Sequence, residues 1–117
     1  MTAVRIYHNP RCSKSRETLA LLEQQGAEIE IVPYLDTPPD NATLSELLEQ
    51  LGLSARELMR RKEAPYTELG LDNPDLSEAE LVQAMCDYPK LIERPIVVKD
   101  GRAVLGRPPE NVLELFK

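Results

Sequence analysis

The residues best suited to chemistry lie in one short stretch, His8-Asn9-Pro10-Arg11-Cys12-Ser13-Lys14-Ser15-Arg16. It follows a short apolar segment, residues 4–7, and precedes leucines that are spaced as in a helix. A cysteine at a strand-to-helix turn lies near unpaired backbone N–H groups and the positive end of the helix dipole. Both favour the thiolate, the nucleophilic form, and the basic residues of the stretch act in the same direction. We therefore predict that Cys12 is a reactive thiol rather than a small buried core residue.

Composition narrows the class of protein. The 117 residues are enough for one domain with a hydrophobic core and too few for two. No apolar run approaches the roughly 20 residues of a membrane span, and the first residues lack the apolar segment of a secretion signal. The two cysteines do not form a close pair, which is typical of a reducing compartment. We expect a cytoplasmic protein, and a monomer.

The net charge is −6, which argues against nonspecific binding to nucleic acid or to an anionic membrane. Nine of the 14 basic residues are nevertheless arginines. A local site for an anion is therefore compatible with an acidic protein.

The order of predicted elements indicates an α/β fold. Strands at 4–7 and 29–32 flank a helix that ends at Gly26, which makes a βαβ unit. Three Ser/Thr-x-x-Glu patterns then predict helix starts at Thr43, Ser54 and Ser77, and residues 63–74 read as a polar loop. A strand at 94–98, an Asp-Gly turn, a strand at 102–105 and a final helix complete the chain.

This order is the skeleton of the thioredoxin/glutaredoxin fold, with a mixed four-stranded sheet of βαβ and ββα units. We predict a single thioredoxin-like domain over residues 1–117 that carries a helical insertion at about 42–90. Cys12 stands where such folds place their nucleophile. Cys86 follows the apolar face of the third capped helix, so we interpret it as a core thiol.

Four motifs resemble the glutaredoxin-dependent arsenate reductase family, to which Spx-like regulators are related. They are Ile6-Tyr7-His8-Asn9-Pro10-Arg11-Cys12, Glu63-Ala64-Pro65-Tyr66 with Glu68-Leu69-Gly70-Leu71, Arg94-Pro95-Ile96-Val97-Val98, and Gly106-Arg107-Pro108-Pro109. The resemblance covers essentially the whole chain. It implies that the activity is the reduction of arsenate to arsenite.

The resemblance also implies roles for single residues. Cys12 is the implied nucleophile on arsenate, and the arginines implied to hold the oxyanion are Arg60, Arg94 and Arg107. Helical periodicity alone does not separate Arg60 from Arg61. His8 and Ser15 match positions that tune the cysteine, and Pro95 matches the cis-proline of thioredoxin-like folds. No metal or tightly bound cofactor is expected.

The chemistry suits these residue types. Arsenate is a tetrahedral anion like phosphate, and guanidinium groups bind such anions through paired, charge-assisted hydrogen bonds. Attack by Cys12 and loss of water would give a covalent cysteine–arsenic adduct, which a second thiol must reduce. Position 15 of a Cys-x-x-Cys motif is Ser15 here. We therefore expect electrons from glutathione as co-substrate, with glutaredoxin as the partner that resolves the mixed disulfide, as the resemblance to the family also implies.

Three other readings stay open at this point. The first is a thiol reductase that acts on another oxyanion or on mixed disulfides. The second is a Spx-like transcription regulator, although such proteins commonly carry a Cys-x-x-Cys switch. The third is an interaction module in which Cys12 is only structural, and the presence of Arg94 and Arg107 argues against it.

Overall fold

Four strands form one mixed sheet in the computed structural model, which describes residues 3–116. The strands are β1 (Ala3–Tyr7), β2 (Glu28–Val32), β3 (Ile96–Lys99) and β4 (Arg102–Leu105), in the spatial order β2-β1-β3-β4. β1 pairs in parallel with β2 and antiparallel with β3, and β3 pairs antiparallel with β4. This topology confirms the predicted thioredoxin-like sheet.

The connections follow from local sequence. Helix α1 (Ser13–Gln24) joins the two parallel strands, and Gly26 after it has φ +70°, a left-handed conformation that glycine adopts without strain. Asp100 and Gly101 join β3 to β4 with φ values of 52° and 78°. Two consecutive positive φ values characterise the tight hairpin turn that the Asp-Gly pair predicts.

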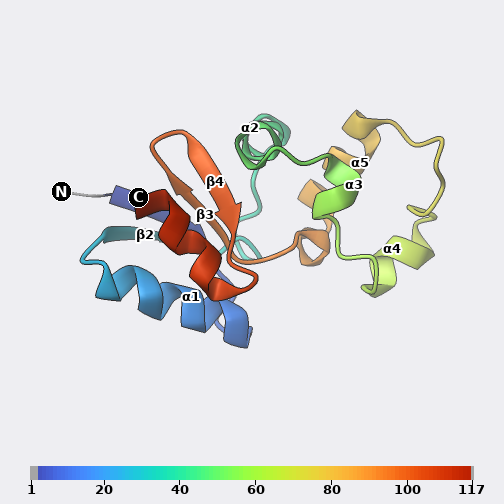
Figure 1. The fold of residues 1–117 in the computed structure, drawn as a ribbon. Helices are drawn as coiled ribbons and strands as arrows, with labels where there is room; N and C mark the ends of the chain where they lie inside the picture. The colour runs from blue at the N-terminus through green and yellow to red at the C-terminus, as the bar shows by residue number, and fades with distance from the viewer. Residues whose placement is uncertain (1–2, 117) are drawn as a thin grey trace. The chain divides into compact units, whose positions relative to one another are not determined.

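The core of the sheet lies under two helices. Val4, Ile6 and Val97 from the strands pack with Leu22 of α1 and with Val112 and Leu115 near the C-terminus. The last two belong to η2 (Pro109–Phe116), a 3₁₀ helix where the sequence predicts a helix of unspecified type. Figure 1 shows α1 and the red C-terminal helix side by side, in agreement with their packing in this core.

The chain divides into two compact units, Met1–Thr37 with Arg94–Lys117 and the intervening Pro38–Glu93. The second unit is helical. It contains α2 (Asn41–Leu51), α3 (Ala55–Leu58), α4 (Ala64–Glu68), α5 (Glu78–Asp87) and the 3₁₀ turn η1 (Pro89–Leu91). Within residues 3–116, no helix combines the length and the apolar character needed to cross a membrane.

The predicted helix starts are correct in two of three cases. Ser54 caps α3 in a complete capping box with Glu57, and the Ser77 side chain accepts the Glu80 N–H at the start of α5. The prediction for Thr43 is wrong, because α2 begins earlier and Asp40 is its cap. The Asp40 carboxylate accepts the Thr43 N–H at 2.8 Å. Both residue types favour this position, so the pattern alone does not choose between them.

The prediction of a loop over residues 63–74 is also wrong, because it contains the short helix α4. Pro65 lies in the first turn of α4, where a missing N–H costs nothing. Arg56 of α3 fixes the segment from outside: its guanidinium donates to the Tyr66 hydroxyl and to the carbonyls of Leu71 and Asn73 at 2.8–3.0 Å. A long-range contact of this kind leaves no local sequence signal.

Candidate active site

Cys12 is the N-cap residue of α1. Its backbone is extended, with φ −96° and ψ 123°, and its N–H donates to the Asn9 carbonyl at 3.0 Å. The side chain makes no capping hydrogen bond, so the sulfur is not used to complete the helix. The residue is 8% exposed. The thiol therefore lies in a largely buried position beside the positive end of the helix dipole.

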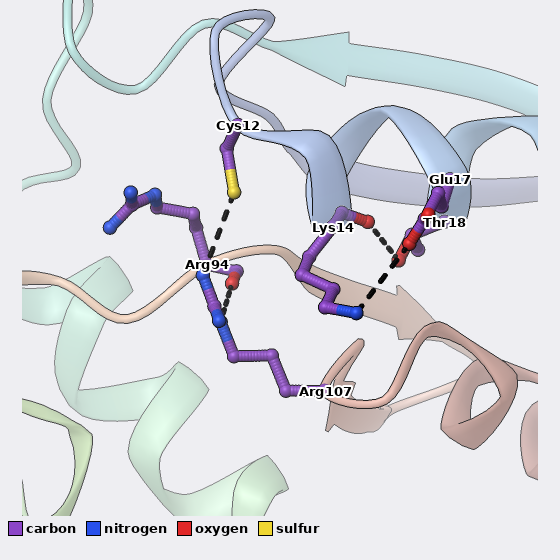
Figure 2. A network of polar contacts seen from close by, with 6 residues as sticks. All are labelled: Cys12, Lys14, Glu17, Thr18, Arg94 and Arg107. Carbon is purple, nitrogen blue, oxygen red and sulfur yellow. Dashed lines mark hydrogen bonds and ion pairs between the residues drawn. The ribbon is translucent and has the colours of Figure 1, made fainter.

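Arg107 is the cation that contacts this sulfur. Its Nη2 atom lies 3.5 Å from Cys12 Sγ, and its Nε–H donates to the Arg94 carbonyl at 2.7 Å. In Figure 2, dashed lines join the Arg107 guanidinium to the Cys12 sulfur and to the Arg94 carbonyl. Because the second hydrogen bond fixes the guanidinium, a positive charge is held where it stabilises a thiolate and attracts an anion.

Two basic neighbours of Cys12 in the sequence, Lys14 and Arg16, contact other groups than its sulfur. Lys14 Nζ lies 3.8 Å from a Glu17 carboxylate oxygen, and Arg16 Nη1 donates to the Pro10 carbonyl at 2.9 Å. The contact with sulfur comes from a residue 95 positions later. The available sequence signal for Arg107 is the Gly-Arg-Pro-Pro motif, since spacing from the cysteine gives none.

His8 and Ser15 form a buried pair behind the cysteine loop. His8 Nδ1 and Ser15 Oγ share a hydrogen bond of 2.6 Å, and the same oxygen accepts the Asn9 N–H at 3.0 Å. Burial, and secondarily the charge of Arg16, lower the pKa of His8 from its ordinary value of 6.5. The imidazole is therefore neutral at pH 7. The pair ties the end of β1 to the first turn of α1, on both sides of Cys12.

Arg94 and Pro95 directly precede β3, whose first residue, Ile96, pairs with Tyr7 at the end of β1. Their peptide bond is cis, the form that the resemblance implied, and so is the bond between Arg107 and Pro108. The Pro95 carbonyl accepts the Gly106 N–H at 2.9 Å. The Nε and Nη1 atoms of Arg94 are buried. Figure 2 shows that the Arg94 side chain extends in a different direction from that of Arg107.

Arg60 belongs to the other compact unit. Its N–H donates to the Leu91 carbonyl at 2.7 Å, and its guanidinium lies 3.6 Å from carboxylate oxygens of Glu63 and of Glu93. Arg61 is exposed, whereas Arg60 is half-buried. The structure thus distinguishes two arginines that periodicity does not, and the role of Arg60 toward an anion stays a prediction.

Cys86 lies in α5, in that same second unit. It is half-buried beside the buried residues Val82 and Met85, so it flanks the core rather than filling it. Burial, followed by the charges of Asp87 and Asp40, raises the pKa of this thiol above its ordinary value. A raised pKa leaves less thiolate at neutral pH, which distinguishes Cys86 from a nucleophile.

The geometry defines a thioredoxin-like protein whose candidate reactive group is a cysteine thiol. A cysteine caps the first helix of a thioredoxin-like fold, a guanidinium contacts its sulfur, and a neutral histidine–serine pair braces its loop. Such an arrangement suits a thiol that attacks an anionic substrate, because the arginine offsets the repulsion between two negative charges.

Comparison with known proteins gives the family. The sequence profile described as the ArsC family matches residues 7–115, so the chain belongs to this family. The Escherichia coli (strain K12) protein YfgD, whose name gives no function, is 65% identical over 96% of this chain and 95% of its own length. A protein named arsenate reductase from Neisseria meningitidis serogroup A is 54% identical over 96% of this chain and 97% of its own.

A solved structure supports the same assignment. The structure titled arsenate reductase from Vibrio cholerae superposes with a TM-score of 0.95 at 56% sequence identity. The match covers 97% of this chain and 98% of that chain. This chain therefore shares its fold, over nearly the whole length of both chains, with that structure.

Proposed function

We propose that this protein is an arsenate reductase in which Cys12 is the nucleophile. The observation that carries the proposal is the contact of Arg107 Nη2 with Cys12 Sγ at 3.5 Å. It combines a thiol and an anion-binding group at one point of the fold. Membership of the ArsC family and relatives named arsenate reductase at about half identity support arsenate as the substrate.

Arginines and the helix start bind the oxyanion in this proposal. The Arg107 guanidinium offers paired N–H donors to a tetrahedral anion, and Arg94 and Arg60 supply two further guanidinium groups. The N–H groups in the first turn of α1 add donors that the Cys12 side chain does not occupy. These groups also stabilise the negative charge that develops as an oxygen leaves arsenic.

The reaction proceeds in balanced steps. The Cys12 thiolate attacks arsenic, a sulfur–arsenic bond forms, and one arsenate oxygen takes up protons and leaves as water. Arsenic is still pentavalent in this adduct. A second thiol then attacks the Cys12 sulfur, so that a disulfide forms, the sulfur–arsenic bond breaks, and its electron pair stays on arsenic as arsenite.

Glutathione is the proposed second thiol. Position 15 is the buried Ser15 rather than a cysteine, and burial raises the pKa of the Cys86 thiol, which leaves less of its thiolate at neutral pH. The resulting Cys12–glutathione disulfide is reduced by glutaredoxin, which restores the Cys12 thiol. His8 and Ser15 hold the loop around the nucleophile. Pro95 fixes the backbone next to Arg94, and its carbonyl accepts the Gly106 N–H.

A coupled assay tests this function. Wild-type protein with arsenate, glutathione, glutaredoxin and glutathione reductase should oxidise NADPH, and omission of arsenate, glutathione or glutaredoxin should stop the oxidation. Cys12→Ser should abolish turnover and still bind the anion, because the arginines remain. Cys86→Ser is the matched control and should retain turnover.

Two results would point to other functions. NADPH oxidation that depends on this protein, with a glutathione mixed disulfide and without glutaredoxin, but that does not occur with arsenate, would identify a disulfide reductase. Lack of turnover with either substrate, together with Arg107 substitutions that alter binding to a protein partner, would favour a regulator of the Spx type.

A further inference from the structure

The glycine before Arg107 lies in a space with no room for a side chain. A Cβ atom on Gly106 would lie 2.5 Å from Thr18 Oγ1, 2.8 Å from Pro95 Cγ and 3.1 Å from Thr18 Cγ2. The first two distances are well inside van der Waals contact. Thr18 is fully buried in α1, and its hydroxyl donates to the Lys14 carbonyl at 2.8 Å, so it does not yield easily.

The close approach of Gly106 to Thr18 affects the position of the next residue, Arg107. Gly106 is also tied to the sheet, because its N–H donates to the Pro95 carbonyl at 2.9 Å. Arg107 starts from this point and reaches back to the Arg94 carbonyl and the Cys12 sulfur. Any side chain at position 106 would push the backbone of Arg107 away from α1, and therefore away from the helix that carries Cys12.

Asn111 holds the other side of the same turn. Its Nδ2 atom donates to the Arg107 carbonyl at 3.0 Å and to the Leu105 carbonyl at 3.4 Å. The two acceptors flank Gly106, so one exposed amide fixes the turn in the form that the glycine permits.

We propose that Gly106 and Asn111 are positioning residues that hold the Arg107 guanidinium against the Cys12 sulfur. The proposal rests on the proposed function in taking Cys12 as the nucleophile and Arg107 as its cation. It adds that the position of the Arg107 guanidinium depends on two features. The first is the lack of a side chain on Gly106, which lets the backbone lie against Thr18, and the second is the pair of hydrogen bonds from the Asn111 amide.

The test measures the charge beside the sulfur without using arsenate. Iodoacetate is an anion and iodoacetamide is neutral, and both alkylate the same thiolate. The ratio of their rates at Cys12, followed by peptide mass spectrometry, therefore reports the local positive charge and cancels changes in thiolate fraction. Gly106→Ala should lower this ratio about fivefold, the effect of one unit charge at about 4 Å in water.

Three further variants separate positioning from general damage. Gly106→Ala combined with Thr18→Ala removes two of the three close atoms and should restore most of the ratio. In an Arg107→Ala background, Gly106→Ala should lower the ratio no further, because the residue through which it acts is gone. Asn111→Ala, which is exposed and should fold, should lower the ratio, whereas Asn41→Ala in the other unit should not.

The outcomes are distinct. An unchanged ratio in folded Gly106→Ala, or a further fall in the Arg107→Ala background, would overturn the proposal. If Gly106→Ala does not fold, the Asn111→Ala ratio decides: a fall supports the proposal, and an unchanged ratio overturns it. If the alkylation ratios of all variants are as expected but the wild-type protein does not reduce arsenate, the proposed function is refuted and the positioning role of Gly106 and Asn111 is supported.

Discussion

At the scale of single residues, the site depends on one long-range contact. Arg107 contacts the Cys12 sulfur through Nη2 and the Arg94 carbonyl through Nε. A planar guanidinium makes these two contacts at once because its donors point in fixed directions. A compact ammonium group has the same charge without this geometry.

Arg107→Lys should therefore impair turnover although the charge is kept. Loss of one charge-assisted hydrogen bond is worth about 1.5–3 kcal/mol, or roughly ten- to hundredfold in rate if it acts in the transition state. Steady-state kcat/KM for arsenate measures the effect. Arg102→Lys is the control, since that exposed arginine of β4 donates to the Leu115 carbonyl at 3.3 Å rather than to groups around Cys12. Equal losses in both variants would contradict a special role for Arg107.

His8 predicts a pH dependence of stability. Its pKa is lowered in the folded protein by burial and by Arg16, so the unfolded chain binds more protons below pH 6.5. Stability from the neutral imidazole is therefore present above pH 6.5 and decreases as the pH falls from there toward the folded pKa. Urea unfolding between about pH 7.5 and 5.5 measures this slope, above the range of most carboxyl groups.

The sequence contains a single histidine, which makes the attribution direct. His8→Asn should flatten the slope, and Arg16→Gln should raise the pKa of His8 as followed by NMR of its ring protons. A wild-type stability that is constant, or that rises as the pH falls through this window, would refute the burial of a neutral imidazole.

The sequence predicts some site residues and misses others for physical reasons. Cys12 is evident because a strand and a helix start leave local signals around it. Arg107 is evident only from a motif, since its contact with sulfur joins distant segments. The close approach of Gly106 to Thr18 cannot be predicted from the sequence, because the sequence shows neither which glycine has no room for a side chain nor which residues surround it.

At the scale of elements, the junction of β1 with α1 places the nucleophile. The central strand β1 ends at Tyr7, and α1 begins at Ser13, so the intervening loop carries Cys12 to the helix start. The hairpin of β3 and β4 returns the chain beside it and delivers Arg107 just after β4. Both features follow from strand patterns and turn residues, and the sequence predicts both.

Helix caps in the second unit give a quantitative prediction. Ser54 accepts the Glu57 N–H at 3.2 Å, and the Glu57 carboxylate accepts the Ser54 N–H at 2.9 Å. Ser54→Ala should lower the free energy of unfolding by about 1 kcal/mol, because a backbone donor loses its partner. Chemical unfolding measures it. Ser45→Ala, on the exposed face of α2, is the control and should be close to neutral; an equal effect would contradict the cap.

The sequence is less informative about the short elements of this unit. The start of α2 is ambiguous because Asp40 and Thr43 are both good caps three residues apart. Helix α4 is too short for a periodic signal, and Arg56 stabilises its surroundings from α3. Tertiary contacts, rather than local propensity, decide such segments.

At the scale of the whole molecule, the predicted site residues are distributed over two compact units. The unit with the sheet contains Cys12, His8, Ser15, Arg94, Pro95 and Arg107. The helical unit contains Arg60, held between two carboxylates, and Cys86, whose thiol pKa is raised by burial. The match to the ArsC family, over residues 7–115, includes parts of both units.

The most direct test of the account is the identity of the arsenic product. Arsenate is incubated with the protein, glutathione and glutaredoxin, and arsenite is quantified by chromatography coupled to mass spectrometry. We predict one arsenite for each glutathione disulfide formed, with wild-type protein and not with Cys12→Ser. Arsenite formation that does not exceed the protein-free reaction, or that persists in Cys12→Ser, would contradict the central claim.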